Sequence, residues 1–517
     1  MYQVGFSMLN GTILQCFHGY TSAGSSAQRS LWQQIAEDAS ALAGVGFSAL
    51  WLPPMTKGSA GVADMGYGAY DLYDLGEFDQ CGSVATKYGD RTQLGEAIAA
   101  AHAANLQVYG DVVLHRKHGG DRTETLEGTP VFWRDRTRAM APAQSIVARS
   151  QFTFPGRKQR YSGMTWEGRH FQMVNHNCAL SPAEPSSENR LLYRLKPKEF
   201  SAEVDVRMGN QPPAAPLNNQ VSNRRELVCE LDLEMPEVIA ALNDWGRWFV
   251  RETKVDGLRI DGVKHVPASF AQAWLQQLRA EKPSLFAMGD YWSNQVNDLH
   301  WYIAKSGGQM SLFDVPLHYN FHFASRQGHY YDLRKILQGT LMDEQPTLAV
   351  TFVENHNSQP LQLLESAVEA WFKPLAYALI LLRREGYPCV FAGDYYGAQY
   401  QESRGVEDSR EVCLLSQREI LDRLLKARSH YAYGEQLDYF EQANIIGWTR
   451  LGDADHAQAM AVVISNGQSG QQWMDTGRPH AQFVDMTGHL SEPMWTNGDG
   501  WAAFGAQGGS VSVWVEV

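Results

Sequence analysis

Short apolar runs alternate with amphipathic stretches along most of the chain. The runs have the length and composition of buried strands, and the stretches between them carry apolar residues at helical spacing. The predicted strands are Thr12–Phe17, Phe47–Pro53, Val108–Leu114, Val255–Asp261, Ser284–Asp290, Met310–Pro316, Leu348–Asn355 and Pro388–Ala392. Helical patterns include Leu31–Ala43, Gln93–Ala104, Phe270–Ala280, Val368–Arg383 and Ser416–Ala427. Eight strands separated by helices predict an α/β fold, a (β/α)8 TIM barrel.

The pattern changes in two places. Residues 115–233 show little helical periodicity and much Gly, Pro and Ser, as in Gly209–Pro216. An insertion this long is more typical of a subdomain than of a loop, so we expect an irregular β-rich insert after strand 3. From about Tyr433 short strands and turn residues predict a C-terminal all-β domain, a β-sandwich. The expected division is a barrel over 1–114 and 234–432, an insert over 115–233 and the sandwich over 433–517.

Composition narrows the class of protein. The 517 residues are 44% hydrophobic and 20% charged, with a formal net charge of −13. A negative chain argues against a nucleic-acid partner, because phosphate binding needs clustered Lys and Arg, and no stretch has the length of a membrane span. The six cysteines are scattered, and Met1–Leu14 lacks the basic and apolar regions of a signal peptide. We therefore expect a cytoplasmic protein with reduced thiols.

The most informative segment runs from Val255 to His265, with the sequence VDGLRIDGVKH. Asp261 stands at the C-terminal end of a predicted barrel strand, where barrel enzymes carry catalytic groups. The two-residue spacing turns Arg259 to the same face, so a cation lies beside the carboxylate. Such a cation lowers the pKa of a carboxyl group and keeps it ionised, as a nucleophile requires. For an Arg-x-Asp pair alone, a salt bridge at the strand end is the simpler interpretation.

The whole segment resembles the second of four signature segments of the α-amylase family of glycoside hydrolases. Other stretches carry the same resemblance, most closely to the cytoplasmic and liquefying bacterial α-amylases. They are Leu14–His18, Gly66–Phe78, Trp371–Ala378 and Gly508–Ser512. In this family the Asp of the second segment is the nucleophile, so the resemblance assigns that role to Asp261. It also implies that Arg259 fixes Asp261, and that Lys264 and His265 contact neighbouring sugars.

Retaining glycoside hydrolysis needs a second carboxyl group, about 5–5.5 Å from the nucleophile, to protonate the leaving oxygen. The family has Glu at this position, after the fifth strand, and this chain has Asp290. The loss of one methylene withdraws the proton donor by about 1.5 Å. Because a misplacement of about 1 Å can lower a rate roughly 10²-fold, we expect Asp290 to be a weakened acid.

A third carboxylate in the family stabilises the distorted, positively charged sugar, and this chain has Asn357 in its place, after His356. An amide can hydrogen-bond sugar hydroxyls but brings no negative charge to a developing cation. Loss of one such group typically costs about 10²–10³ in rate. The resemblance implies that His356 binds the reactive sugar. Tyr67 matches the family's sugar-stacking tyrosine, and Trp292 is a second candidate platform, with ordinary core packing as the alternative for both rings.

The first signature segment also departs from the family. The family typically has Asn-His where this chain has His115-Arg116, and that Asn binds structural calcium. Another ligand of the family, often Asp, is Glu230 here. Because calcium prefers oxygen ligands whereas imidazole suits zinc and similar ions, His115 argues against the usual calcium site. The resemblance therefore suggests calcium, but these residues disfavour it. Whether the protein binds a metal, and which one, stays open.

Two functions fit these residues. The first is an α-amylase-like retaining glycoside hydrolase acting on α-1,4-glucans (starch, glycogen, maltooligosaccharides) by hydrolysis or by transfer. Asp261 would attack the anomeric carbon, Asp290 would protonate the leaving oxygen, and Asn357 would hold the distorted sugar. The second is a glucan-binding or regulatory relative that keeps the cleft and has lost hydrolysis, which the altered positions 115, 290 and 357 favour. An α-glucan or maltooligosaccharide is the expected partner in both cases.

Overall fold

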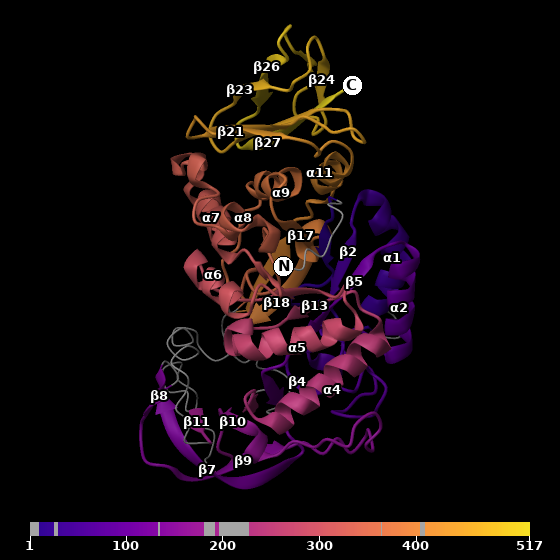
Figure 1. The fold of residues 1–517 in the computed structure, drawn as a ribbon, viewed down its shortest axis with the longest axis vertical. Helices are drawn as coiled ribbons and strands as arrows, with labels where there is room; N and C mark the ends of the chain where they lie inside the picture. Colours follow the sequence, from indigo (N-terminus) through magenta and orange to yellow (C-terminus); the bar gives the residue numbers. More distant parts are fainter. Residues whose placement is uncertain are drawn as a thin grey trace.

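A closed barrel of eight parallel strands forms the centre of the molecule (Figure 1). The computed structural model describes residues 10–24, 29–132, 135–179, 192–195, 227–362, 364–403 and 409–517. In barrel order the strands are β1 (Ile13–Gln15), β17 (Tyr387–Phe391), β16 (Ala349–Phe352), β15 (Ser311–Phe313), β14 (Phe286–Gly289), β13 (Gly257–Ile260), β5 (Gln107–Val112) and β2 (Ala49–Leu52). Every one coincides with a strand expected from the hydrophobic pattern, so the barrel prediction is confirmed.

Helices separate the strands and cover the barrel. They are α1 (Leu31–Val45), α2 (Arg91–Ala103), α4 (Pro236–Thr253), α5 (Ala268–Glu281), α6 (Val296–Lys305), α7 (Val315–Gln327), α8 (Leu341–Glu344), α9 (Lys373–Leu382), α10 (Ala392–Tyr395) and α11 (Arg418–His430). The first two begin at capping boxes, in which Ser30 and Asp90 each accept a hydrogen bond from the backbone N–H of a Gln three residues on.

Several expected boundaries differ from those of the structure, and two of the differences have a clear local cause. The helix expected from Val368 begins at Lys373, because Pro374 occupies the first turn, where a helix tolerates proline. The strand expected to reach Pro316 ends at Phe313, because α7 begins at Val315.

The insert after β5 folds as an antiparallel sheet at the lower end of Figure 1. Its strands are β6 (Arg116–His118), β7 (Arg122–Phe132), β8 (Asp135–Ala139), β9 (Gln144–Gln151), β10 (Phe171–Val174), β11 (Leu192–Arg194) and β12 (Val228–Leu231). The β-rich and irregular character is as expected, because register shifts interrupt the pairing of β10 with β12, of β7 with β8 and of β7 with β9. The Gly209–Pro216 stretch lies outside the described residues. Because the insert leaves the barrel directly after β5, it begins at the C-terminal rim of the barrel.

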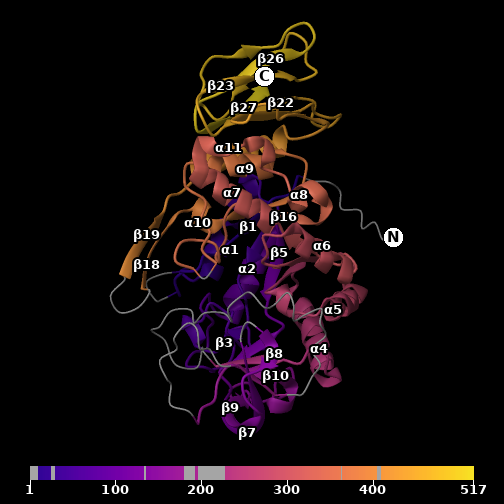
Figure 2. The ribbon, with the colours of Figure 1, turned by 90° about the vertical axis from the view of Figure 1, so that its left-hand side faces the viewer.

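The C-terminal all-β domain is confirmed at the opposite end of the molecule (Figure 2). One sheet contains β20 (Gln436–Tyr439), β21 (Ile445–Arg450), β22 (Met460–Ser465), β27 (Ser510–Glu516), β24 (Gln482–Asp485) and β25 (Met494–Trp495), and a second contains β23 (Gly470–Asp475) and β26 (Trp501–Ala506). Alternate residues of β22 face opposite sides. Val462 joins the barrel core, whereas Val463 joins a separate cluster with Phe483 and Phe504. The sheet thereby covers α9 and α11.

Two further expectations concern the whole chain. All six cysteines are free thiols, as their scatter predicts. Over the part of the chain that the structure describes, no helix combines the length and the apolar character needed to cross a membrane.

Candidate active site

Asp261 and Asp290 lie at the same level of the barrel because each directly follows one of two neighbouring strands, β13 and β14. The N–H of Asp261 donates to Val112 O at 2.9 Å, and the N–H of Asp290 donates to Ile260 O at 3.1 Å. These bonds extend the parallel ladder one residue past each strand. Gly262, in the left-handed region with a φ of 52°, then turns the chain away from the rim.

Arg259 joins three carboxyl groups. Its Nη1 donates to Asp261 Oδ1 at 2.7 Å and to Asp111 Oδ1 at 2.9 Å, and its Nη2 donates to Asp290 Oδ2. The Arg259 side chain is fully buried, and the guanidinium lies 5.2 Å from the centre of the Trp51 ring. One cation therefore holds both the expected nucleophile and the expected acid through its two amino groups. A simple salt bridge at the strand end would join Arg259 to Asp261 alone.

The pKa values of these two carboxyl groups move in opposite directions. Burial raises the pKa of Asp290 to about 6, with the Arg259 cation opposing the shift. Burial acts on Asp261 as well, but Arg259 and Arg116 outweigh it and hold the Asp261 pKa below its usual value. Carboxyl groups whose pKa values are separated in this way take the roles of acid and nucleophile in glycosidases. Between the two values, Asp261 is ionised while Asp290 carries a proton.

The Asp290 carboxyl group also has an oxygen that can hold this proton. Oδ2 accepts from Arg259, whereas Oδ1 is buried and has no hydrogen-bond partner among the described residues. An oxygen that already accepts from a cation is a poor site for a proton, so Oδ1 is the atom suited to donate it.

The third carboxyl group, Asp111, is a member of the site that the sequence pattern does not single out. It lies on β5 directly opposite Arg259 in the parallel register. Its Oδ2 also accepts from Trp51 Nε1 at 3.1 Å and from Tyr67 OH at 2.8 Å. Burial raises the Asp111 pKa against the opposing Arg259 charge. The available signal was its position at the start of the first signature segment, three residues before the end of a predicted strand.

Tyr67 and His356 join the site as a stacked pair. Their ring centres lie 5.2 Å apart with planes only 3° from parallel. The Nδ1 of His356 pairs with Gln15 Nε2 at 3.0 Å. Burial, then the Arg259 charge, lowers the His356 pKa well below its usual value, so this imidazole is neutral at physiological pH. A neutral imidazole near Asp261 can hydrogen-bond a sugar hydroxyl without adding positive charge.

Asn357 follows His356 at the rim, and its backbone N–H donates to Asn355 Oδ1 at 2.8 Å. The nearest carboxylate in sequence, Glu354, cannot substitute for it. Glu354 Oε2 accepts from the N–H of Val368 at 3.1 Å and lies 3.7 Å from Lys373 Nζ. Glu354 is thus committed to a buried ion-pair network and does not supply the negative charge that is absent at position 357.

The remaining expected sugar contacts are Trp292, Lys264 and His265. Trp292 is 6% exposed and packs with the rings of His318, Tyr319 and Phe352, at centroid distances of 5.8, 6.4 and 6.2 Å. This environment resembles core packing more than an open stacking platform. Lys264 and His265 lie in the short turn after Asp261, where Lys264 Nζ approaches the ring of Tyr291 at 5.8 Å.

Of the residues that the structure describes, His115 and Glu230 do not fit the calcium ion of the family. The Glu230 carboxylate is occupied by Arg136, whose Nη1 donates to its two oxygens at 3.0 and 2.7 Å. His115 stacks on His265 with ring centres 5.3 Å apart. Burial lowers the pKa of both imidazoles, and the charge of Arg136 contributes. A guanidinium beside the would-be ligands repels a divalent cation. Within the described ranges, no cluster of three or more His, Cys, Asp or Glu side chains could hold a metal.

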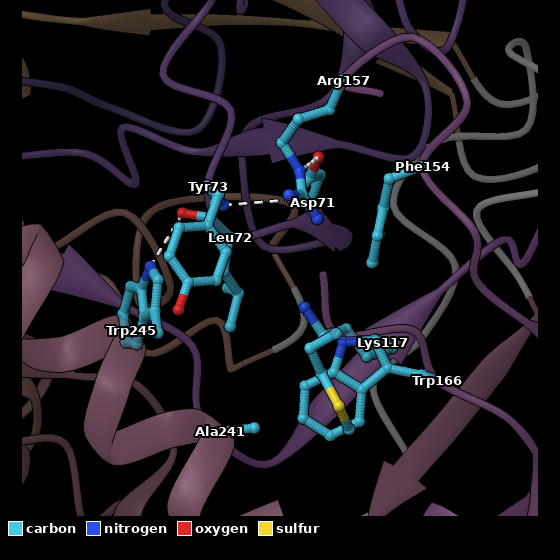
Figure 3. Close-up of a pocket in the computed structure, with 10 residues that line it drawn as sticks. Asp71, Leu72, Tyr73, Lys117, Phe154, Arg157, Trp166, Ala241 and Trp245 are labelled. Carbon is cyan, nitrogen blue, oxygen red and sulfur yellow. Dashed lines mark hydrogen bonds and ion pairs between the residues drawn. The ribbon is translucent and has the colours of Figure 1, made fainter. Parts of the chain in front are cut away.

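A small, partly open cavity lies between the insert and α4 (Figure 3). Its volume of about 10 Å³ suits roughly one water molecule. Lys117 and the ion pair of Arg157 with Asp71 line it, and neither Asp261 nor Asp290 does. The cavity therefore belongs to the packing of the insert and not to the reacting groups.

A (β/α)8 barrel that places an ionised and a protonated carboxyl group on adjacent strand ends has the arrangement that a glycoside hydrolase requires. No protein-family model matches the chain. The chain is nevertheless 44% identical over 514 residues to the α-amylase of Geobacillus stearothermophilus, covering 98% of this chain and 87% of that protein. It is 38% identical over 513 residues to the cytoplasmic α-amylase of Escherichia coli K12, covering 98% and 99%. The chain belongs to the α-amylase family.

Two further comparisons agree. A glucan 1,4-α-maltohexaosidase of Bacillus sp. strain 707 is 41% identical over 512 residues, covering 98% of this chain and 92% of that protein. The solved α-amylase of Geobacillus thermoleovorans, complexed with acarbose, covers 98% of both chains with a TM-score of 0.62 at 16% identity, which supports the fold alone.

Proposed function

We propose that the protein is a retaining hydrolase of α-1,4-glucans. One observation carries the proposal: Arg259 holds Asp261 and Asp290 together while their pKa values are displaced in opposite directions. The names of the relatives, α-amylases and a maltohexaosidase, support the substrate class. A maltooligosaccharide or longer α-glucan is the substrate that follows.

The reaction uses two steps. Asp261 attacks the anomeric carbon while Asp290 gives its proton to the leaving glycosidic oxygen, and a covalent glycosyl–enzyme forms. Asp290, now ionised, then takes a proton from a water molecule that attacks the same carbon and releases Asp261. The sugar hydroxyl of a second glucan in place of water would give transfer instead of hydrolysis.

A second function, glucan binding without turnover, is favoured by one specific feature. Asn357 brings no charge to the transition state, and Glu354 is held by Lys373 and cannot replace it. Loss of one such group costs about 10²–10³ in rate. Ground-state binding depends on neutral contacts such as those of Tyr67 and His356, so this loss leaves affinity for the sugar largely intact.

A reducing-sugar assay on starch and maltoheptaose separates the two functions. Wild type, Asp261→Asn and the double variant Asp290→Glu/Asn357→Asp are compared, with maltoheptaose affinity measured by calorimetry. We expect measurable wild-type turnover that Asp261→Asn abolishes and that the double variant raises at least 10²-fold. Wild type as slow as Asp261→Asn, with affinity retained, would refute hydrolysis and leave the binding function.

We also infer a cytoplasmic location, supported by the relative named as a cytoplasmic α-amylase in E. coli. Fractionation of the source cells, with the protein detected by antibody, tests this: recovery from the medium or the periplasm would contradict it.

A further inference from the structure

Arg116 brings a second guanidinium to the nucleophile. It is the first residue of β6, where the chain passes from the barrel into the insert. Its Nη2 donates to Asp261 Oδ2 at 3.4 Å, and the two side chains are 16% and 11% exposed. This is the only side-chain hydrogen bond of Arg116 to the described residues, and its Nε is buried without a partner there. The side chain is therefore directed to the nucleophile and is not tied to the insert.

The two oxygens of Asp261 are held unequally. Oδ1 accepts from Arg259 at 2.7 Å, a short charge-assisted bond, whereas Oδ2 accepts from Arg116 at the longer 3.4 Å. The more weakly held oxygen is the one that can leave its partner and approach the anomeric carbon. Because Arg259 is also bound to Asp111 and Asp290, only the Arg116 contact is specific to Asp261.

We propose that Arg116 is a positioning residue for the nucleophile, which holds Oδ2 of Asp261 and favours the step that breaks the glycosyl–enzyme bond. This inference rests on the proposed hydrolase function for its kinetic part. In the first step the Oδ2–carbon bond forms, the glycosidic carbon–oxygen bond breaks, and the leaving oxygen takes the Asp290 proton. Oδ2 then loses its negative charge, and Arg116 loses its anionic partner.

The second step restores that partner. Water attacks the anomeric carbon, Asp290 takes the water proton, and the electron pair of the broken carbon–oxygen bond returns to Asp261 as a carboxylate. Arg116 stabilises this carboxylate in the free enzyme and not in the covalent state. A charge-assisted hydrogen bond of this kind corresponds to a change of about tenfold in rate. Arg116 therefore slows the first step and speeds the second.

The test compares Arg116→Gln, which removes the charge, with Arg116→Lys, which keeps it. Arg138→Gln, at an exposed position on β8, is the matched control. The substrate is a nitrophenyl maltooligosaccharide, and the covalent intermediate is quantified by mass spectrometry after rapid acid quenching. We expect Arg116→Gln to slow breakdown of the intermediate about tenfold and to accumulate it. Arg116→Lys should lie near wild type, and the control should match wild type.

The pH profile gives a second readout that a merely structural role would not move. The titratable or charged groups that face Asp261, besides Arg116, are Arg259, Asp111, Tyr67, Asp290, His265 and His356. Removal of one facing cation raises the Asp261 pKa, so the acidic limb of kcat/KM should move to higher pH in Arg116→Gln. An unmoved limb together with no accumulation of the intermediate would overturn the proposal.

The Asp261 pKa can also be measured without turnover. A 13C titration of labelled aspartate, with the resonance assigned from Asp261→Asn, should show a higher pKa in Arg116→Gln than in wild type. If no variant turns over and this shift appears, the hydrolase proposal fails and the contact of Arg116 with Asp261 stands. If the shift is absent, the role of Arg116 fails whether or not the protein is active. Arg116→Met, which keeps the apolar stem, replaces Arg116→Gln should the latter not fold.

Discussion

Turnover of maltooligosaccharide should be confined to a mildly acidic pH window. Asp261 must be ionised while Asp290 carries a proton, and the Asp261 pKa lies below its ordinary value of about 3.9. The Asp290 pKa is about 6. The population with both groups in the required state is therefore high from about pH 4 to 6, and above pH 6 kcat/KM falls tenfold per pH unit. At pH 8 about one hundredth of the plateau remains.

Asp290→Asn isolates the group responsible. The amide cannot titrate or donate the proton, so the rate should fall by about 10²–10⁴ and lose its alkaline limb. Initial rates on unactivated maltoheptaose measure this, because a nitrophenolate leaving group would need little help from an acid. Asp244→Asn, which removes an exposed carboxylate on α4, serves as the control. A wild-type alkaline limb above about pH 8, or a limb that survives in Asp290→Asn, would refute the assignment of the acid.

Three other changes probe the surroundings of the site. Lys373→Met leaves the buried Asp394 and Glu354 without their shared cation. The free energy of unfolding in urea should therefore fall by about 3–5 kcal/mol. A loss no larger than that caused by Lys335→Met, at an exposed position, would contradict this. Tyr67→Phe removes the hydroxyl that donates to buried Asp111, so the free energy of unfolding should fall by roughly 1–3 kcal/mol. An unchanged denaturation midpoint would mean that this hydrogen bond is dispensable. Excess EDTA should leave the melting temperature unchanged, because Arg136 occupies the Glu230 carboxylate. If EDTA lowers the melting temperature by several degrees and calcium restores it, the protein has a metal site despite the pairing of Glu230 with Arg136.

The convergence of the reacting groups follows from the sequence because the barrel is closed. Each parallel strand of such a barrel delivers its C-terminal end to one rim. Asp261 and Asp290 end their predicted strands and His356 directly follows one, so their neighbourhood is fixed once the eight strands are recognised. The opposite pKa shifts were also foreseeable in part, since Arg259 lies two residues from Asp261.

Contacts that depend on the insert could not be predicted in this way. Arg116 meets Asp261 across 145 positions of sequence, and Arg136 meets Glu230 across 94. Both contacts depend on how the insert sheet folds back on the rim, which strand periodicity does not specify. The environment of Trp292 could not be predicted either, because its aromatic neighbours come from α7 and β16. The sequence beside Asp290 contains no sign of these neighbours.

The charges around Asp261 indicate whether the altered positions change kcat or KM. Arg259 is shared among Asp111, Asp261 and Asp290, Arg116 adds a further cation, and position 357 adds no anion. The neutral ground-state sugar is nearly indifferent to this balance, whereas the oxocarbenium-like transition state is destabilised by it. The deficit should therefore appear in kcat with KM little changed, as expected when an interaction made only in the transition state is missing. Restoring the carboxylate by Asn357→Asp should raise kcat without tightening binding, and a gain confined to KM would show that Asn357 acts on the bound sugar instead.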